Sequence, residues 1–572
     1  MAGLFLARTG DPGFAEARAQ FARHGFAGCT EHELFGWRLL HAPHRQGGPE
    51  TLLAEGGDLV AVAGTLTCDG LMGRPALLAL RDMAGLPAPD WSRLGGHFAA
   101  FVRRGGRSFL FTDYFGAFPV YHDTDARLFS TSLLAAAAAL PRLSFDPQGV
   151  YEFAFNVVPI GDDTVFAELK MLGPDRVAEP GIGFHHLARP LADEAPMPLD
   201  ERIAAHRDRL MAVVSDHVRQ FGDNVFCALS GGLDSRLALA ALRAAGCRPS
   251  LFVYGGPDSI DVRLARAIAA AEGHAIEWID KEAWREVSPE EFPEQVERNF
   301  QAYDGLPNYG ELFENGANAA ARAARHRGGA LSVSGGCGEI FRNFFFLPDR
   351  RFSAAAVART FFARYARGDV TGAFDESSFL RAIEDKILAA LGRAGERSKL
   401  PRGQIEQIYP RVRCRALFGR EIGLEAHEGA YLMPFLDHRL VAEAMRLPLA
   451  LKHAGRFEAA LLNAIDPALA AYPSAYGHDF AGPPGRRHRR SEWATRIRPV
   501  ALRQRSYAIR RRLGPVADEH GGLLSPDYMG RVVDLDYPAM RRFFRTERIA
   551  DSGMMRRIAN LEYLAGRLGV AG

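Results

Sequence analysis

The stretch VFCALSGGLDSRLALAALRAAG, residues 225–246, decides the fold of the second part of this chain. It begins with a short apolar run, typical of a buried strand, and ends with apolar residues at helical spacing. Between them lies the loop Ser230-Gly231-Gly232-Leu233-Asp234-Ser235. Its glycines let backbone N–H groups approach an anion at the positive end of the new helix, and its serines add hydroxyl groups. The pattern therefore predicts a phosphate-binding loop.

The loop also carries a carboxylate, Asp234, which repels phosphate unless a bridging Mg²⁺ lies between them. The chain has no GxxxxGK[ST] motif, which disfavours a P-loop NTPase. Glycines that only shape a strand-to-helix turn are the alternative, but the complete SGGxDS pattern favours phosphate. The loop is similar to the pyrophosphate-binding loop of N-type ATP pyrophosphatases. The nucleotide-binding residues predicted on this basis are Leu229, Ser230, Gly231, Gly232, Asp234, Ser235, Val253, Gly335 and Gly336.

Helix and strand patterns alternate around this loop from about residue 200. An amphipathic helix covers residues 206–221, and further apolar strands follow at intervals filled by helical segments such as DVRLARAIAAAEG. This alternation predicts a doubly wound, mainly parallel sheet of the α/β class over residues 200–480. Helices dominate from about residue 350. The expected strands are PSLFVYG from 249, HAIEWID from 274 and GALSVSG from 329.

The first part of the chain, residues 1–190, has short strand patterns separated by turn signals. They predict a layered α+β domain, and LLAAAAALP at 133–141 predicts a helix that ends at Pro141. Four prolines and several acidic residues between 180 and 198 indicate a linker. The expected strands are DLVAVAG from 58, HFAAFVRR from 97, SFLFTD from 108, FPVYHD from 118 and RLFSTS from 127.

Bulk properties set limits on function. The 572 residues carry a net charge of +2, which argues against a surface that coats nucleic acid. Six cysteines without CxxC spacing are typical of reduced thiols and give no metal site. No signal peptide and no uninterrupted apolar run of 18 residues is present, so we expect a cytoplasmic protein without a membrane partner.

One segment, residues 485–513, stands out by its charge. It reads GRRHRRSEWATRIRPVALRQRSYAIRRRL and lies in a C-terminal extension, residues 481–572, that we expect to be helical and rich in arginine. It could bind an acidic leader peptide, a phosphorylated substrate or RNA. The alternative is a solvated helix whose arginines pair with acidic neighbours.

Several further motifs occur in an order that resembles the asparagine synthetase family. In the first part they are GGHFAAFV from 95, TDYFGAFPVYHD from 112, FSTS from 129 and ELKMLGPDRV from 168; in the second they are VYGGPDSIDVRLARAIA, SVSGGCGEIF and YLMPFLDHRLVAEAMRLP. The resemblance covers the chain to about residue 480. It implies a class II amidotransferase-like (Ntn) domain followed by an N-type ATP pyrophosphatase domain. It also implies ATP and Mg²⁺ as cofactors and a ligase that adenylates a carboxylate.

The chain departs from the family at the glutamine site. Members that hydrolyse glutamine have a cysteine after the initiator methionine, but this sequence has Ala2, and VAGTLTCDG stands where a glutamine-holding segment is expected. We therefore expect the first domain to be a scaffold. The nitrogen donor would be ammonia or a substrate amine. The lasso-peptide cyclases and the β-lactam-forming synthetases are family branches that also lack this cysteine.

The chain also departs from the family at the synthetase site. The segment from Ser334 to Glu339 is one residue shorter than the family's SGDGADE and keeps only its final carboxylate. Glu339 could complete a metal pair with Asp234, or it could cap the helix that follows. The family's catalytic lysine aligns near Arg456 to Glu458, and Lys452 falls one turn too early. Arg456 could supply the positive charge, although both residues could instead be ordinary surface residues.

The segment AYDGLPNYGELF precedes the strand that leads to Gly335. Its residues Tyr303, Asp304 and Tyr309 could lie beside a substrate carboxylate or amine, or they could serve packing alone.

The leading hypothesis is an AMP-forming carbon–nitrogen ligase that acts on a small-molecule or peptide carboxylate, with Glu339 and Arg456 as catalytic residues. The alternatives are macrolactam formation of the lasso-peptide cyclase type, a non-catalytic ATP-binding or partner-binding scaffold, and an ATP pyrophosphatase that acts on a nucleic-acid base.

Overall fold

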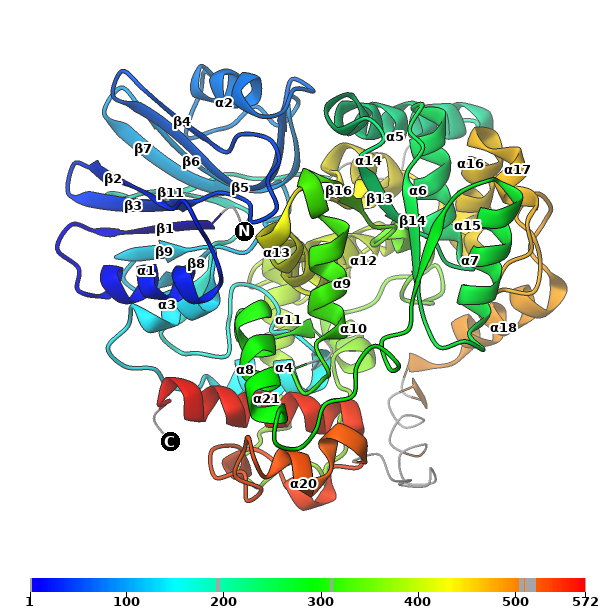
Figure 1. The fold of residues 1–572 in the computed structure, drawn as a ribbon. Helices are drawn as coiled ribbons and strands as arrows, with labels where there is room; N and C mark the ends of the chain where they lie inside the picture. The colour runs from blue at the N-terminus through cyan, green and yellow to red at the C-terminus, as the bar shows by residue number, and fades with distance from the viewer. Residues whose placement is uncertain are drawn as a thin grey trace.

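The structure is a computed structural model that describes residues 3–191, 196–308, 312–500, 502–503, 509 and 521–570. In this part of the chain the protein is a mixed α/β protein with two antiparallel sheets and one parallel sheet (Figure 1). The prediction of an α/β protein with a parallel sheet is therefore confirmed. Ala2 and Tyr309, which the sequence singled out, lie outside the described residues.

The two antiparallel sheets are both built from the first part of the chain. One has the strand order β10-β8-β9-β1-β3-β2 and the other has β12-β11-β7-β6-β5-β4. All five strands expected from the sequence are present, and the strands before residue 58 were not predicted. The bounds are β1 Gly3–Arg8, β2 Thr30–Leu34, β3 Trp37–Ala42, β4 Leu52–Glu55, β5 Asp58–Cys68, β6 Leu94–Arg104, β7 Arg107–Thr112, β8 Tyr121–Asp123, β9 Leu128–Ser130, β10 Leu169–Met171, β11 Arg176–Glu179 and β12 Gly183–His186.

The two antiparallel sheets stack on each other, with helices on their outer sides. Side chains of β5 point alternately toward the other sheet and toward the outer helix. Leu59 and Ala61 belong to the large core that also contains β1 and β3. Val60 and Val62 point to the other face, into a separate core with the helix α2, Arg74–Arg81. Figure 1 shows α2 on the outer face of this sheet, with α1 (Gly13–Arg23) and α3 (Leu133–Ala138) beyond the first sheet. Because β5 is covered on both faces, its sequence is a nearly continuous apolar run.

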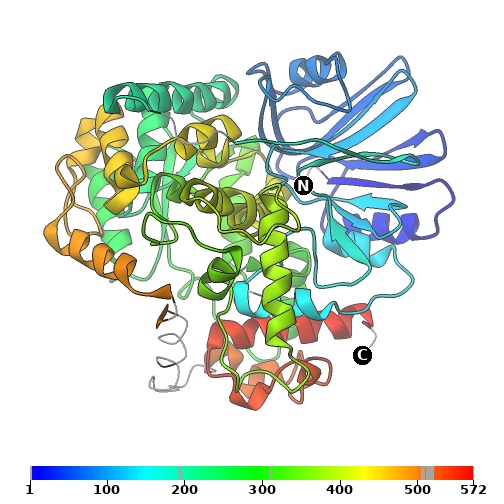
Figure 2. The same ribbon diagram turned by 180° about the vertical axis from the view of Figure 1, so that it is seen from behind.

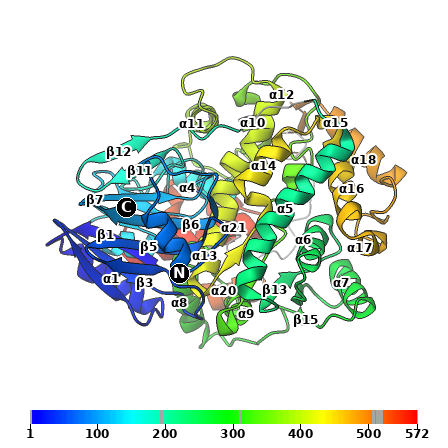
Figure 3. The ribbon, with the colours of Figure 1, turned by 90° about the horizontal axis from the view of Figure 1, so that it is seen from above.

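The parallel sheet carries the predicted loop at its centre. Its order is β15-β14-β13-β16-β17, so the winding reverses at β13, and such a reversal places a ligand crevice at the carboxyl ends of the strands. The predicted strands and the amphipathic helix α5 are confirmed, and Figure 3 shows α5 beside α14. The bounds are α5 Leu199–Phe221, β13 Val225–Ala228, α6 Leu233–Ala244, β14 Ser250–Tyr254, α7 Ile260–Ala271, β15 Ile276–Ile279, β16 Leu331–Val333, β17 Tyr431–Leu432 and α14 His438–Met445.

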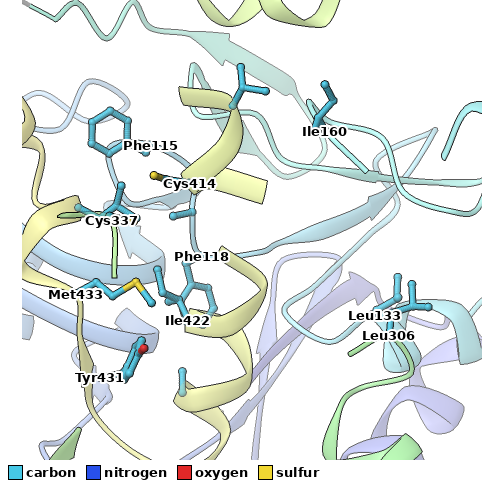
Figure 4. Close-up of a cluster of buried hydrophobic side chains, with 14 of the residues drawn as sticks. Phe115, Phe118, Leu133, Ile160, Leu306, Cys337, Cys414, Ile422, Tyr431 and Met433 are labelled. Carbon is cyan, nitrogen blue, oxygen red and sulfur yellow. The ribbon is translucent and has the colours of Figure 1, made fainter. Parts of the chain in front are cut away.

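The two parts of the chain share one buried core. Figure 4 shows Phe118, from the loop after β7, near Ile422 and Met433 of the second part, and Phe115, from the same loop, near Cys337 and Cys414. The backbone N–H of Tyr431 donates to Thr65 Oγ1 at 2.9 Å, so a side chain of the first part holds the edge strand β17. The first part therefore supports the parallel sheet directly.

Helices make up most of the remaining chain, as expected. The last helix, α21, returns to the first part, where Arg557 Nε donates to the carbonyl oxygen of Ala154 at 2.8 Å on α4 (Figure 2). Among the described residues, no helix combines the length and apolar character needed to cross a membrane. The bounds are α4 Pro147–Asn156, α8 Phe292–Ala302, α9 Ala317–Arg325, α10 Ala354–Phe361, α11 Glu376–Ala390, α12 Arg402–Ile408, a π-helix Tyr409–Phe418, α13 Gly419–Glu428, α15 Leu449–Lys452, α16 Arg456–Ile465, α17 Pro467–Ala471, α18 Arg486–Ile497, α20 Pro526–Met529 and α21 Ser552–Leu568.

Candidate functional site

The predicted phosphate loop joins β13 to α6 and is held by its own side chains. The backbone N–H of Ser230 donates to Ser235 Oγ at 3.0 Å, and that of Gly232 donates to Ser230 Oγ at 3.1 Å. The N–H of Gly231 donates to Asp261 Oδ1 at 2.8 Å. These contacts fix the turn at the positive end of α6, where an anion is favoured.

A second loop, residues 334–339, lies against the first. A Cβ atom on Gly335 would lie 2.8 Å from the carbonyl carbon of Asp234, and one on Gly338 would lie 2.4 Å from Asp234 Cγ. Cys337 between them adopts a positive φ of 70° and is fully buried. Only glycine permits this approach at positions 335 and 338, so the structure brings the two predicted loops together.

Arg342 lies at the centre of the acidic groups of this site. Its Nη2 donates to Asp234 Oδ1 at 2.5 Å and lies 3.8 Å from Glu339 Oε1, while its Nε lies 3.3 Å from Glu458 Oε2. Its Nη1 donates to Tyr476 Oη at 3.2 Å. One guanidinium therefore faces three carboxylates, one from each of three segments far apart in the sequence.

One positive charge cannot balance three negative charges. Glu458 is fully buried, and both of its oxygens lack a hydrogen-bond partner. Its burial, together with the nearby Asp234, raises its pKa well above the ordinary value, although Arg342 opposes this effect. This carboxyl group therefore binds a proton more readily than an ordinary glutamate, which reduces the negative charge that Arg342 must balance.

Glu339 does not cap the segment that follows it, so that alternative was wrong. It lies inside a short 3-10 turn, Gly338–Phe341, and no side chain caps this turn. Instead, Tyr409 Oη donates to Glu339 Oε2 at 2.5 Å. Burial raises the pKa of Tyr409 well above its usual value, so the phenol keeps its proton and remains a donor.

Oxygen donors for Mg²⁺ are present, but they do not form a complete cage. Across the described residues, no three His, Cys, Asp or Glu side chains are placed to hold one metal ion. Asp234 and Glu339 are hard carboxylate donors that suit Mg²⁺, and the unpartnered oxygens of Glu458 lie nearby. A magnesium ion here fits only with further ligands from phosphate or water and with Asp234 released from Arg342. The metal assignment stays a prediction.

Other predicted residues lie elsewhere. Arg456 is exposed and lines a separate cavity with arginines of α18, so the structure does not bring it to Asp234. Lys452 is not a surface residue, because it is buried and donates to Glu406 Oε2 at 3.2 Å. Asp304 accepts hydrogen bonds from the first residues of α3 and from Arg420, which gives it a structural role. Tyr303 is buried and donates to Glu314 at 2.8 Å.

A cavity of about 260 Å³ opens at the carboxyl ends of β14, β16 and β17. Its lining includes Ser334, the first residue of the second loop, and Tyr254, the last residue of β14. Lys281 Nζ lies 4.1 Å from the centre of the Tyr254 ring and makes no ion pair within the described chain. The remaining lining residues include Asn308, Asn318, Arg322, Arg325, Phe418, Glu421 and Met433.

The floor of this cavity is a buried ionic network. Arg322 Nε lies 3.2 Å from Glu425 Oε1, and Arg325 also contacts this carboxylate. Burial raises the pKa of Glu421, and the neighbouring Glu425 adds to this effect. With Lys281 also present, the lining has an excess of positive charge and suits an anionic group.

Arg342 was not predicted from the sequence to be a site residue. It follows Glu339 by three residues, a spacing that places two side chains on one face of a helical turn, and this signal was available. Glu458 was named from the sequence only as the end of the range that aligns with the family's catalytic lysine. Its approach to Asp234 depends on the packing of α16 against α6, which no local pattern reveals.

Comparisons with known proteins leave the family open. No family model matches the sequence, and no curated protein matches it. The glutamine phosphoribosylpyrophosphate amidotransferase from B. subtilis, in complex with ADP and GMP, is 11% identical with a TM-score of 0.24; the match covers 48% of this chain and 65% of that one, just under two thirds. A structure described as the allosteric regulatory enzyme of purine biosynthesis is 11% identical with a TM-score of 0.23, covering 50% and 67%. Similarity at this level carries no conclusion about function.

Proposed function

We propose that the protein is an ATP-dependent ligase of the asparagine synthetase type, which adenylates a carboxylate and forms an amide with ammonia or a substrate amine. The single observation that carries this proposal is the contact between the two glycine loops at Asp234, at the reversal point of a parallel sheet. The triphosphate would bind at the loop Ser230–Ser235, with further contacts at Leu229, Val253 and Gly335–Gly336. The first part of the chain would be an amidotransferase-like domain without glutamine hydrolysis.

The carboxylate substrate would enter the cavity lined by Lys281 and Ser334. Its negative charge would be held by Lys281 above the network of Arg322 and Arg325. One carboxylate oxygen attacks the α-phosphorus of ATP, the bond to the bridging oxygen breaks, and pyrophosphate leaves. The amine then attacks the acyl carbon, AMP departs with the electron pair, and the amine loses one proton.

Arg342 and Asp234 would serve the first of these steps. Mg²⁺, held by Asp234 and Glu339 together with ATP phosphates, would supply positive charge for the departing pyrophosphate. Arg342 would supply the fixed cation beside the negative charge that develops in this step. The sequence had predicted this role for Arg456. Neither guanidinium can act as a general base, so the amine proton must leave to solvent or to substrate phosphate.

The test is pyrophosphate release from ATP and Mg²⁺ with a panel of carboxylates that includes aspartate, glutamate and short peptides. We expect release that requires a carboxylate, repeated turnover only with an amine acceptor or hydroxylamine that removes the adenylate, and loss of at least about a hundredfold in Asp234→Asn. The matched control is Asp349→Asn, an exposed aspartate outside the site, which should retain full activity.

If only a peptide that carries both a free amine and a carboxylate supports turnover, the reaction is macrolactam formation within one peptide. Absence of release with every substrate, together with ATP binding that is equal in wild type and Asp234→Asn, would refute the ligase and favour a non-catalytic scaffold.

A further inference from the structure

A second cavity, of about 500 Å³, lies between α18 and the start of α16. It is lined by Glu492 and by one helical face of α18, at positions 486, 489, 490, 493 and 496, a spacing of three and four residues. Four of these five residues are arginines and the fifth is Trp493. Arg456 completes the lining from α16. Figures 1 and 2 show α18 on the side of the molecule away from the N-terminal sheets.

The positive charge of this cavity is not balanced within the described chain. Arg496 lies 3.9 Å from Glu492, but Arg456, Arg486, Arg489 and Arg490 make no ion pair with any described residue. Burial, and the nearby Arg496, lower the pKa of His453 to about 4, so this lining residue is neutral at pH 7. Arginines that share one concave surface without counter-ions repel one another, and an anionic ligand would relieve this repulsion.

The opposite face of α18 anchors the helix to the body of the protein. The ring of His488 stacks on Tyr476 with centroids 5.2 Å apart, and Tyr476 accepts the hydrogen bond from Arg342. Glu492, between the two faces, also lines the cavity and has a side chain that is only 8% exposed. The arginine row is therefore held in a fixed orientation beside the candidate site and is not a freely moving solvated helix. The alternative that arginines of α18 pair with acidic neighbours holds for Arg496 and Glu492, and no such pair with a described residue is present for Arg486, Arg489 or Arg490.

The spacing of the charges favours one class of ligand. Arg486 and Arg490 are four residues apart, about 6 Å along a helix axis, and Trp493 lies about 4.5 Å further. Alternate side chains of an extended peptide recur at about 6.6–6.8 Å. Planar guanidinium groups pair with carboxylates through two parallel hydrogen bonds. Trp493, whose side chain is 53% exposed, offers an apolar surface at the end of the row.

We propose that this cavity binds an extended acidic peptide segment, with alternate carboxylates on Arg486 and Arg490 and an apolar side chain on Trp493. The site is separate from the phosphate loop, so its occupation does not depend on the proposed ligase activity. A partner or peptide substrate with an acidic stretch would be recruited by this surface.

The experiment is fluorescence anisotropy of a fluorescein-labelled octapeptide of alternating Glu and Ala, with the Gln and Ala octapeptide as the neutral probe. We expect the acidic peptide alone to bind the full-length protein. Arg490→Gln should weaken binding by about tenfold, because a charge-assisted pair is lost. The matched control is Arg487→Gln, an exposed arginine on the same helix that does not line the cavity.

A second readout uses the tryptophan itself. Peptide binding should change the intrinsic fluorescence of the wild type, and Trp493→Phe should remove this change while the other four of the five tryptophans remain. Equal weakening by Arg487→Gln and Arg490→Gln would show unspecific charge attraction and overturn the proposal. Binding of inorganic triphosphate that depends on Arg490, without binding of the acidic peptide, would overturn it as well. Because no ATP turnover is measured, failure here leaves the ligase proposal intact.

Discussion

The guanidinium of Arg342 donates from Nη2 to both carboxylate oxygens of Asp234, at 2.5 Å from Oδ1. The same side chain approaches Glu339 and the buried Glu458, so a single cation joins the phosphate loop, the second glycine loop and α16. This relationship fixes the geometry of the candidate site, and it makes the stability of the protein sensitive to changes at four residues.

Removal of Arg342 should destabilise the protein. Arg342→Ala leaves Asp234 without its cation, and because the two side chains are 22% and 24% exposed, we expect the cost of a lost charged hydrogen bond, about 1.5–3 kcal/mol. Urea unfolding at pH 7 measures the loss. Arg359→Ala, at an exposed arginine on α10, is the control and should change the unfolding free energy by less than about 0.5 kcal/mol. Equal effects of both substitutions would contradict a central role of Arg342.

The contact between the two glycine loops should tolerate no methyl group. In Gly338→Ala, the added Cβ meets Asp234 Cγ at 2.4 Å, so one loop must move, at a cost of about 1–3 kcal/mol. We expect lower unfolding free energy and weaker ATP binding, measured by urea unfolding and calorimetry. Gly368→Ala is the matched control, because nothing lies within 4 Å of its new Cβ and its φ is not positive. Unchanged ATP binding in Gly338→Ala would show that the loops do not act together.

The buried Glu458 should give the protein a distinct pH dependence. Its pKa is raised in the folded state by burial and by Asp234, so folding favours the protonated form. The contribution to stability is therefore fully present below the pKa of an unfolded glutamate and is lost as the pH rises through the folded-state value. Glu458→Gln, which cannot ionise, should weaken the decrease in unfolding free energy between pH 5 and pH 8.

The control for this titration is Glu277→Gln, at an exposed glutamate of β15, which should leave the pH profile of unfolding unchanged. A profile for Glu458→Gln that is parallel to the wild type would mean that Glu458 is ionised throughout and that its pair with Arg342 is a true ion pair.

Lys281 should govern the affinity for the carboxylate substrate and leave ATP binding unchanged. Lys281→Gln removes the cation beside the Tyr254 ring in the 260 Å³ cavity, and loss of a charged hydrogen bond costs about 1.5–3 kcal/mol, or at least about tenfold in KM. Steady-state kinetics at saturating ATP measure this change. Lys399→Gln, at an exposed lysine, is the control. An equal rise in the KM for ATP would place Lys281 in the nucleotide site.

The strand and helix pattern was largely predictable from local sequence. The strands from Val225 to Ala228 and from Ser250 to Tyr254 are apolar runs bounded by turns, and the parallel sheet followed from their alternation with helices. The strands before residue 58 and the short strands β10, β11 and β12 were missed; of these, β2 carries polar residues on a half-exposed face and has no strict alternation. The predicted boundaries of the domains, at 190, 200 and 480, stay predictions.

The site was predictable only where its residues are adjacent in the chain. The sequence by itself determined the loop Ser230–Ser235 and its place between strand and helix, because both depend on backbone conformation and on neighbouring side chains. Tertiary structure alone decided that Glu458 faces Asp234, that Lys452 is buried on Glu406 and that Arg456 belongs to the cavity of α18. The first placement depends on how α16 packs against α6, which couples side chains more than two hundred residues apart, and the second joins α15 to α12 across 46 residues. No local periodicity carries that information.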